Sequence, residues 1–327
     1  MKIEIGVLII SYLIAVILGI IIIPILKKLK VGQIIRNDGP ESHLKKQGTP
    51  TMGGIIMIIT MILVVAGLYI YLLVSTGNLE IANKIVPILI LTIGFGIIGF
   101  IDDFIKLVLK NTKGLKPMYK MLGLLIISVV YVIYLIYGIK LETVTYIPIL
   151  KEYLIMPVYI YIPFAILVIL GTTNAVNLTD GVDGLASSVC SIIITCLVII
   201  GMKYKMPEIS LLGSITIGSV LGFLMFNLHP AKVFMGDTGS LLLGGIISAM
   251  ALYLRLPLLL IVIALIPVIE TLSVIIQVAY FKKTGKRVFK MTPIHHHFEL
   301  SGWKENKVVA VFSAVTLILC SIGLYII

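Results

Sequence analysis

The chain has 327 residues, of which 59% are hydrophobic and only 13% are charged, and its mean hydropathy is +1.15. A soluble globular domain carries about 25% charged residues, so the composition excludes an ordinary water-soluble protein. The net charge of +11 is explained mostly by lysines and arginines in loops between apolar segments, so we expect no nucleic-acid partner.

Ten apolar segments are long enough, at roughly 20 residues each, to cross the hydrocarbon core of a bilayer. The first, Ile5 to Leu26, is too long for the core of a signal peptide and has no small-residue cleavage site after it. Long apolar segments satisfy their backbone hydrogen bonds as helices in lipid. The sequence therefore predicts an all-α polytopic membrane protein, with residues 1–327 forming a single integral membrane domain. The predicted spans are 4–26, 53–74, 85–101, 121–138, 156–172, 185–202, 209–226, 239–254, 258–280 and 306–326.

The positive-inside rule gives the orientation of these spans, because cytoplasmic loops carry an excess of Lys and Arg. With the N-terminus outside, the cytoplasmic loops contain 19 of the 26 basic residues, and seven remain at the other side. We therefore expect both termini to be extracytoplasmic.

Acidic residues are few, and they gather on the predicted cytoplasmic side. Nine of the fifteen lie there, five are scattered on the outside, and Glu270 alone lies deep within a predicted span. The cytoplasmic loops are also rich in Gly, Asn and His. This distribution predicts an active site at the cytoplasmic ends of the helices.

The first cytoplasmic loop, at 35–54, reads IRNDGPESHLKKQGTPTMGG. Its glycines permit close backbone approach, and Lys45, Lys46 and the threonines are candidates to meet phosphate oxygens. The alternative is a basic loop that only lies against anionic lipid.

The second cytoplasmic motif is FIDDFIK at 100–106. Adjacent carboxylates on a helix point about 100° apart, so Asp102 and Asp103 need not share one ligand. Lys106 is three residues from Asp103 and offers it an ion pair. The alternative is that these acids only cap a span beside lysines.

The third motif is NAVNLTDGVDGLA at 174–186. Asn177, Asp180 and Asp183 are spaced three residues apart, so we expect them to line one face of a helix. Oxygen ligands suit a hard cation such as Mg²⁺ shared with substrate phosphates. A turn that is merely rich in Asn and Gly is the alternative.

The fourth motif is FNLHPAKVFMGDTGSL at 226–241. Asp237 lies in a glycine-rich turn before a helix and is a second candidate metal ligand, and a helix N-terminus favours phosphate. Phe234 is a candidate to stack on a base, although a lone Phe is more often a packing residue.

The fifth motif is MTPIHHHFELSGWKE at 291–305. Its three adjacent histidines lack the spacing of a zinc site and have no Cys nearby, so hydrogen bonding to a diphosphate fits better. Glu270, which follows Pro267 in the ninth span, is a functional candidate as an intramembrane carboxylate. It is equally consistent with a protonated acid or with a bond to backbone that the proline has freed.

Five of these segments together resemble the signature blocks of the phospho-N-acetylmuramoyl-pentapeptide transferases, the bacterial translocase I family of peptidoglycan synthesis. They are GTPTMGG, DDFIK, NAVNLTDGVDGLA, FMGDTGS and PIHHHFELSGW. The aspartate blocks are shared with the wider polyprenyl-phosphate N-acetylhexosamine-1-phosphate transferase superfamily. The histidine block indicates the muramoyl-pentapeptide branch.

The resemblance implies that undecaprenyl phosphate attacks the β-phosphate of UDP-N-acetylmuramoyl-pentapeptide, giving lipid I and UMP, with Mg²⁺ as cofactor. It further implies a homodimer in the bacterial inner membrane, with the active site facing the cytoplasm and a bent ninth helix beside a groove for the lipid tail. In this family Asp237 matches the Mg²⁺ ligand. Asp102 and Asp103 match catalytic or substrate-positioning carboxylates, and Asp180 matches the same acidic centre.

The resemblance also carries over the residues that would bind substrate. They are Asn227 and Phe234 for the uridine; Lys46, Thr51 and Lys120 for uridine or phosphate; Asn177 and Asp183 within the acidic block; and His295, His296 and His297 at the edge of the nucleotide-sugar site.

Three other functions are weighed against this interpretation. A secondary transporter usually places coupling acids near the bilayer midplane, where only Glu270 lies, and a scaffold protein has no need of clustered Asp, Asn and His. Within the enzyme class, the alternative is a GlcNAc-1-phosphate transferase acting on the same lipid. A phosphate monoester is mostly dianionic at neutral pH, since its second pKa is about 6. A general base at Asp102 would therefore have little proton to remove, which favours direct attack over a covalent aspartyl-phosphate.

Overall fold

The structure, a computed structural model, describes residues 2–29, 46, 48–109 and 114–327. Most of the loop at 35–54, including Lys45, lies outside the described residues. In the described part, nine helices are long and apolar enough to cross a membrane, which confirms the predicted all-α polytopic fold. They are α1 (Lys2–Lys28), α3 (Gly54–Ser75), α4 (Glu80–Leu107), α5 (Pro117–Ile133) with its continuation η1 (Tyr134–Gly138), α6 (Val158–Thr179), α7 (Leu185–Lys203), α8 (Pro207–Asn227), α11 (Leu265–Thr284) and α13 (Glu305–Ile326).

The span predicted at 239–254 forms α9 (Gly236–Tyr253), which is enclosed by other helices. Every residue from Thr238 to Tyr253 is buried. Its glycines allow this packing: a Cβ added at Gly244 would lie 2.5 Å from the Cα of Thr173 in α6. Small residues let neighbouring helices approach closely in a membrane. The glycines and serines of α9 are tolerated within the bundle because other helices, rather than lipid, surround it.

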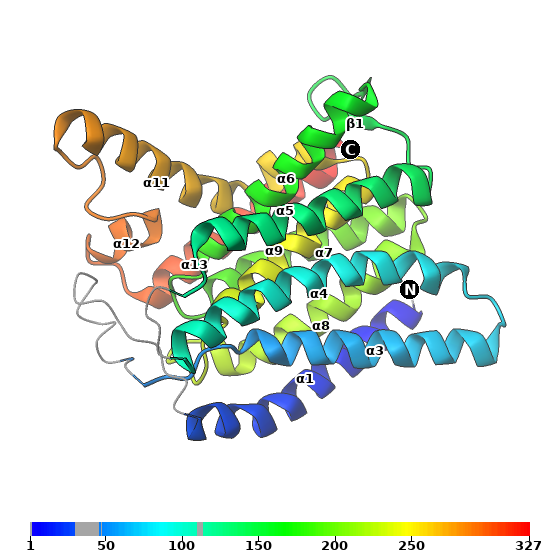
Figure 1. Ribbon diagram of the computed structural model, residues 1–327, viewed down its shortest axis with the longest axis horizontal. Coiled ribbons are helices and arrows are strands. Elements are labelled where there is room, and N and C mark those ends of the chain that lie inside the picture. The colour runs from blue at the N-terminus through cyan, green and yellow to red at the C-terminus, as the bar shows by residue number, and fades with distance from the viewer. Residues whose placement is uncertain (1, 30–45, 47, 110–113) are drawn as a thin grey trace.

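The span predicted at 258–280 is broken into η2 (Pro257–Leu259), α10 (Leu260–Ile263) and α11. The break falls at Ala264, whose backbone is not helical. Pro267 has no N–H to bond the carbonyl four residues before it, so the helix cannot continue regularly through this point. Beyond the break α11 leans away from the other helices, as Figure 1 shows.

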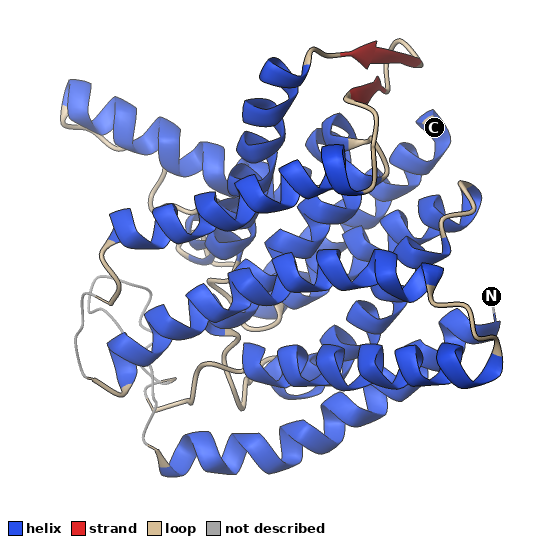
Figure 2. Ribbon diagram, turned by 45° about the vertical axis from the view of Figure 1, so that its right-hand side comes forward, coloured by secondary structure: helices blue, strands red, loops and turns tan. Residues whose placement is uncertain are grey.

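A short β-hairpin, absent from the sequence prediction, connects η1 to α6. Its strands β1 (Val144–Ile147) and β2 (Glu152–Ile155) pair antiparallel, with Val144 opposite Ile155. Figures 1 and 2 place it at the same end of the bundle as the C-terminus. The hairpin is therefore far from the helix ends that carry the polar motifs of the sequence.

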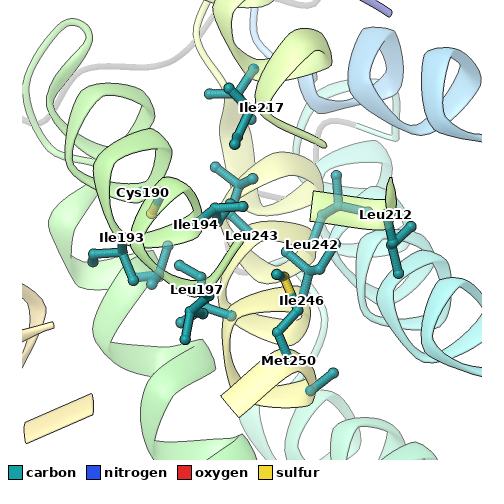
Figure 3. Close-up of a cluster of buried hydrophobic side chains, with 14 of the residues drawn as sticks. Cys190, Ile193, Ile194, Leu197, Leu212, Ile217, Leu242, Leu243, Ile246 and Met250 are labelled. Atoms are coloured by element: carbon teal, nitrogen blue, oxygen red, sulfur yellow. The ribbon is translucent and has the colours of Figure 1, made fainter. Parts of the chain in front are cut away.

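The centre of the bundle is packed by α7, α8 and α9, and Figure 3 shows part of this apolar core. Side chains from the three helices interdigitate there, and most of them are fully buried. This core holds the ends of the three helices in fixed relation. The labelled residues are Cys190, Ile193, Ile194, Leu197, Leu212, Ile217, Leu242, Leu243, Ile246 and Met250.

Figure 1 shows both termini toward one end of the bundle and α12 (Ile294–Glu299) toward the other. The second end also receives the C-terminal end of α4 and the N-terminal end of α5. These are the helix ends for which the sequence predicts an active site.

Candidate active site

The N-terminus of α9 is held by a carboxylate from another helix. Asp103, near the end of α4, accepts hydrogen bonds from the Thr238 N–H at 2.9 Å, the Thr238 hydroxyl at 2.6 Å and the Asp237 N–H at 3.2 Å. The first N–H groups of a helix have no partner within it, so Asp103 acts as a cap supplied from outside. This fixes Asp237, the second residue of α9, against α4.

Asp237 lies where four helices meet. Its Oδ1 accepts a hydrogen bond from the Asn177 side chain of α6 at 2.9 Å. Its Oδ2 forms ion pairs with Lys120 of α5 at 2.7 Å and with Lys106 of α4 at 3.3 Å. Two sequence candidates, Asn177 and Lys120, are thus brought directly onto Asp237.

Asp102 is on the other side of the same two lysines. Lys106 pairs with it at 2.5 Å and Lys120 approaches it at 3.8 Å, while the Leu115 N–H donates to it at 2.8 Å. The sequence predicted that Lys106 would pair with Asp103. The structure corrects this, because Asp103 is turned toward α9 and Lys106 is left to Asp102 and Asp237.

The expectation that Asn177, Asp180 and Asp183 line one helical face is wrong for two of them. Helix α6 ends at Thr179, and Asp180 is its non-helical C-cap. The chain then makes a turn at 180–184 before α7, with Gly184 at a φ of +76°. Asp180 and Asp183 therefore project from a turn and face different neighbours.

Asp180 stays close to the first group of acids. Its enclosed position raises the pKa of its carboxyl well above the ordinary value, and the carboxylates of Asp237, Asp103 and Asp183 raise that pKa further. A backbone hydrogen bond from Gly236 opposes part of this shift.

Asp183 belongs to a second charged group. It pairs with Lys46 at 2.7 Å and with His229 Nδ1 at 3.1 Å, and it accepts the Ala231 N–H at 3.0 Å. Lys46 also reaches Glu305, the first residue of α13, at 2.5 Å. His229 and Glu305 were not singled out as site residues from the sequence, because nothing in their local motifs indicates that α8, α13 and the turn at 180–184 meet.

Thr51 and Phe234 are placed by pairing between two distant segments. The Phe234 N–H donates to the Pro50 carbonyl at 2.8 Å, and the Gly53 N–H donates to the Phe234 carbonyl at 2.9 Å. Thr51 is buried at this junction, whereas Phe234 is partly exposed. Gly236 has a φ of +70°, and a Cβ there would lie 2.5 Å from Asp103 Oδ2 and 2.9 Å from Thr51 Oγ1. The turn before α9 therefore requires glycine.

Asn227, at the end of α8, is occupied by internal contacts. Its side-chain oxygen accepts the Ser187 hydroxyl at 2.9 Å and its amide donates to the Val233 carbonyl at 3.0 Å, and only 2% of the residue is exposed. In this geometry Asn227 ties the segment after α8 to α7 and presents no free group to a ligand.

The three histidines of α12 point to three different partners. His295 is fully buried beside Glu270 of α11, with Nδ1 and Oε1 3.1 Å apart. His296 pairs with Glu299 at 2.8 Å, and His297 accepts the Lys290 N–H at 3.2 Å. The structure thus gives Glu270, unassigned from the sequence, a specific neighbour.

Two groups of three side chains in the described part of the chain have ligand atoms within 4.8 Å of one another. The carboxylate triad is Asp102, Asp103 and Asp237, and the mixed triad is Asp183, His229 and Glu305. The carboxylate triad offers only oxygen, the ligand type that Mg²⁺ prefers, whereas the mixed triad includes a histidine nitrogen. In the mixed triad Lys46 already bridges the two acids. The carboxylate triad is therefore the better fit for Mg²⁺.

Comparisons with known proteins agree with the resemblance seen in the motifs. The profile of the family described as "Glycosyl transferase family 4" matches residues 85–255. The chain is 46% identical to a phospho-N-acetylmuramoyl-pentapeptide-transferase of Acetivibrio thermocellus, over 98% of this chain and 94% of the relative. It is 48% identical to one from Clostridium botulinum, over 97% and 94%, and 46% identical to one from Halalkalibacterium halodurans, over 97% and 95%.

Proposed function

The chain belongs to the phospho-N-acetylmuramoyl-pentapeptide transferases of glycosyl transferase family 4, and we propose that it joins a nucleotide-activated sugar phosphate to a lipid phosphate at the carboxylate triad. Its substrates are UDP-N-acetylmuramoyl-pentapeptide and undecaprenyl phosphate, and its products are lipid I and UMP. The observation that supports this chemistry is the surroundings of Asp237 at the start of α9. Its carboxylate forms ion pairs with Lys120 and Lys106 and accepts a hydrogen bond from Asn177.

Asp237 is the residue that we propose to hold Mg²⁺, with Asp102 beside it. When bound, Mg²⁺ would supply neutralisation of charge on the diphosphate oxygens. Asp103 is committed to the Thr238 hydroxyl and to two backbone N–H groups. Its role is therefore to position Asp237 rather than to meet the substrate.

Phosphoryl transfer needs mainly positioning and neutralisation of charge, and this chain supplies both with lysines. Lys106 and Lys120 lie between Asp102 and Asp237, where they can move toward incoming phosphate oxygens. Asp102 is pinned by Lys106 and by the Leu115 N–H. It is therefore suited to hold the lysines in place, in keeping with direct attack by the lipid phosphate.

The nucleotide end of the donor is proposed to bind at the mixed triad. Lys46 offers a cation for uridine or phosphate, and the partly exposed Phe234 offers a ring for the base. Asp180 and Asp183, on one turn, connect this subsite to the carboxylate triad. His296 and His297, on α12, lie nearer the surface than His295 and are proposed to flank the sugar side of the donor.

The lipid acceptor is proposed to enter along an apolar groove of about 180 Å³ between α6 and the broken helix. Leu167, Gly171 and Ala175 line it from α6, and Ala264 and Val268 line it from the break and α11. Apolar walls suit an isoprenoid chain. We further propose that the protein acts as a homodimer in the bacterial inner membrane, with these helix ends facing the cytoplasm.

The experiment uses the full-length protein in detergent with undecaprenyl phosphate and Mg²⁺, and it measures UMP release. We expect release from UDP-N-acetylmuramoyl-pentapeptide, none from UDP-GlcNAc, and loss of activity with EDTA. Release from UDP-GlcNAc alone would replace the proposed donor with that of the GlcNAc-1-phosphate transferases. No release from either donor by a folded sample would contradict the proposed function.

A further inference from the structure

Glu270 and His295 form a polar pair with no exposed surface, and the transfer chemistry described above does not use it. Both side chains are 0% exposed, with Glu270 Oε1 3.1 Å from His295 Nδ1, and Glu270 Oε2 accepts the His295 N–H at 3.4 Å. Within the described residues, Oε1 and both ring nitrogens lack a well-aligned hydrogen-bond partner. Burying such groups costs free energy, so apolar side chains would serve a purely structural contact better.

The other side of the His295 ring lies on the backbone of the turn at 180–184. A Cβ built at Gly181 would overlap Nε2 and Cε1 of His295. Only glycine leaves room for the imidazole at this position. The buried pair therefore connects α11, through His295, to the turn that follows α6.

The turn at 180–184 places one acid beside the carboxylate triad and another within the mixed triad. Asp180 is in the electrostatic field of Asp237 and Asp103, and Asp183 pairs with Lys46. A displacement of the turn would thus change the carboxylate triad and the mixed triad together.

The pair is not needed to attach α12 to α11, because Gln277 provides a separate anchor. Gln277 of α11 accepts the N–H groups of Val288 and Phe289 at 2.9 and 3.0 Å and donates to the Phe289 carbonyl at 3.0 Å. The segment before α12 is therefore already fixed to α11.

We propose that Glu270 is a positioning residue for the transfer reaction, holding His295 against Gly181 and thereby fixing Asp180 and Asp183. This inference rests on the proposed function.

The test compares Glu270→Gln, His295→Gln and their double variant in full-length protein. The matched control is Glu208→Gln, a buried acid that accepts the Tyr253 hydroxyl at 2.8 Å. A misplacement of about 1 Å at a distance from the chemistry can lower a rate on the order of 100-fold. We expect Glu270→Gln to lower kcat on the order of ten- to 100-fold and to raise the KM for the UDP-linked donor, with the KM for the lipid nearly unchanged.

The double variant should be no slower than the slower single variant, because the two residues act as one unit. Glu208→Gln should keep wild-type kinetics. Wild-type kinetics in Glu270→Gln, or independent effects of the two substitutions, would overturn the inference. If Glu270→Gln does not fold, Gly181→Ala displaces His295 while leaving Glu270 intact, and it should give the same kinetic pattern.

A second measurement does not depend on turnover. In protein labelled with ¹⁵N-histidine, the His295 imidazole signal, assigned by its loss in His295→Gln, should shift in Glu270→Gln and stay in place in Glu208→Gln. An unchanged signal would contradict the pairing. An inactive wild-type protein would overturn the proposed function, whereas an active one with an unaffected Glu270→Gln variant overturns only this inference.

Discussion

The two charged triads lie at the same end of the bundle, yet they are built differently. In the carboxylate triad, Asp102 and Asp237 pair with two lysines, and the third acid, Asp103, caps the N-terminus of α9. In the mixed triad Lys46 bridges Asp183 and Glu305, and His229 is beside both. The first triad therefore offers only carboxylate oxygens to a metal ion, whereas the second offers a mixture of oxygen and nitrogen around one bridging lysine.

This difference suggests a division of work. An oxygen-only group suits a hard cation, which can in turn hold the reacting phosphates. The mixed triad, in which Lys46 bridges two acids beside a histidine, is better suited to exchange these pairs for the polar edges of a nucleotide. We therefore expect substitutions in the carboxylate triad to act on kcat and those in the mixed triad to act on the KM for the donor.

The largest effect is expected for Asp237→Asn. The substitution removes the charge that Lys106 and Lys120 share and leaves the amide a poor ligand for Mg²⁺, so we expect kcat to fall by about 10³-fold. UMP release measured across a Mg²⁺ titration checks this. Near-normal activity at ordinary Mg²⁺ concentrations would remove Asp237 from the proposed role, and Glu80→Gln, an exposed acid paired with Lys84, is the control.

The next largest effect distinguishes the two lysines that pair with the carboxylate triad. Lys120 is 2.7 Å from Asp237 and 17% exposed, whereas Lys106 is 3.3 Å away and 37% exposed. We expect Lys120→Met to lower kcat by about 100-fold and Lys106→Met to lower it less. Single-turnover kinetics with saturating donor would measure both, and the reverse order would show that distance to Asp237 does not rank the lysines.

Lys46→Met should act on binding rather than on the chemical step. It removes a charge-assisted contact, worth about 1.5–3 kcal/mol, and leaves Asp183 and Glu305 facing each other. We expect the KM for the UDP-linked donor to rise by about ten- to 100-fold while kcat changes little. Lys84→Met, which breaks an exposed pair, should leave both constants unchanged. A fall in kcat without a change in the KM for the donor would show that the mixed triad takes part in the chemical step, and it would contradict the division between the two triads.

The smallest effect on turnover is expected for Asn227→Ala. Asn227 binds Ser187 and the Val233 carbonyl and has almost no exposed surface. Its loss should lower the free energy of unfolding by about 1–3 kcal/mol, with little change in the KM for the donor. Thermal unfolding in detergent and donor kinetics measure the two quantities. A large rise in KM at unchanged stability would favour the direct contact with uridine that the family resemblance implies.

The fold was largely predictable because membrane helices are set by length and hydropathy. All ten predicted spans correspond to helical segments, and the glycine-rich span at 239–254 proved to be the enclosed α9. The break at Ala264 was not predictable from apolar length alone. It depends on how Pro267 interrupts the hydrogen bonds of the helix.

The positions of Asp237 and Asn177 at helix ends were predictable, because each lies in a polar motif beside an apolar span. The site was not predictable where the backbone reverses direction. The turn at 180–184 separates Asp183 from Asp180 and brings it to His229 and Glu305, which are far away along the chain. Contacts such as Glu270 with His295 likewise depend on how α11 and α12 pack, and residue spacing does not encode that packing.

Direct cation binding tests the division between the triads most plainly. Mn²⁺ can stand in for Mg²⁺ at oxygen ligands, and its EPR signal reports how much remains free in solution with purified protein. We predict that the wild-type protein and Asp183→Asn both take up Mn²⁺ and that Asp237→Asn does not. Uptake by Asp237→Asn together with its loss in Asp183→Asn would place the cation in the mixed triad and contradict the account.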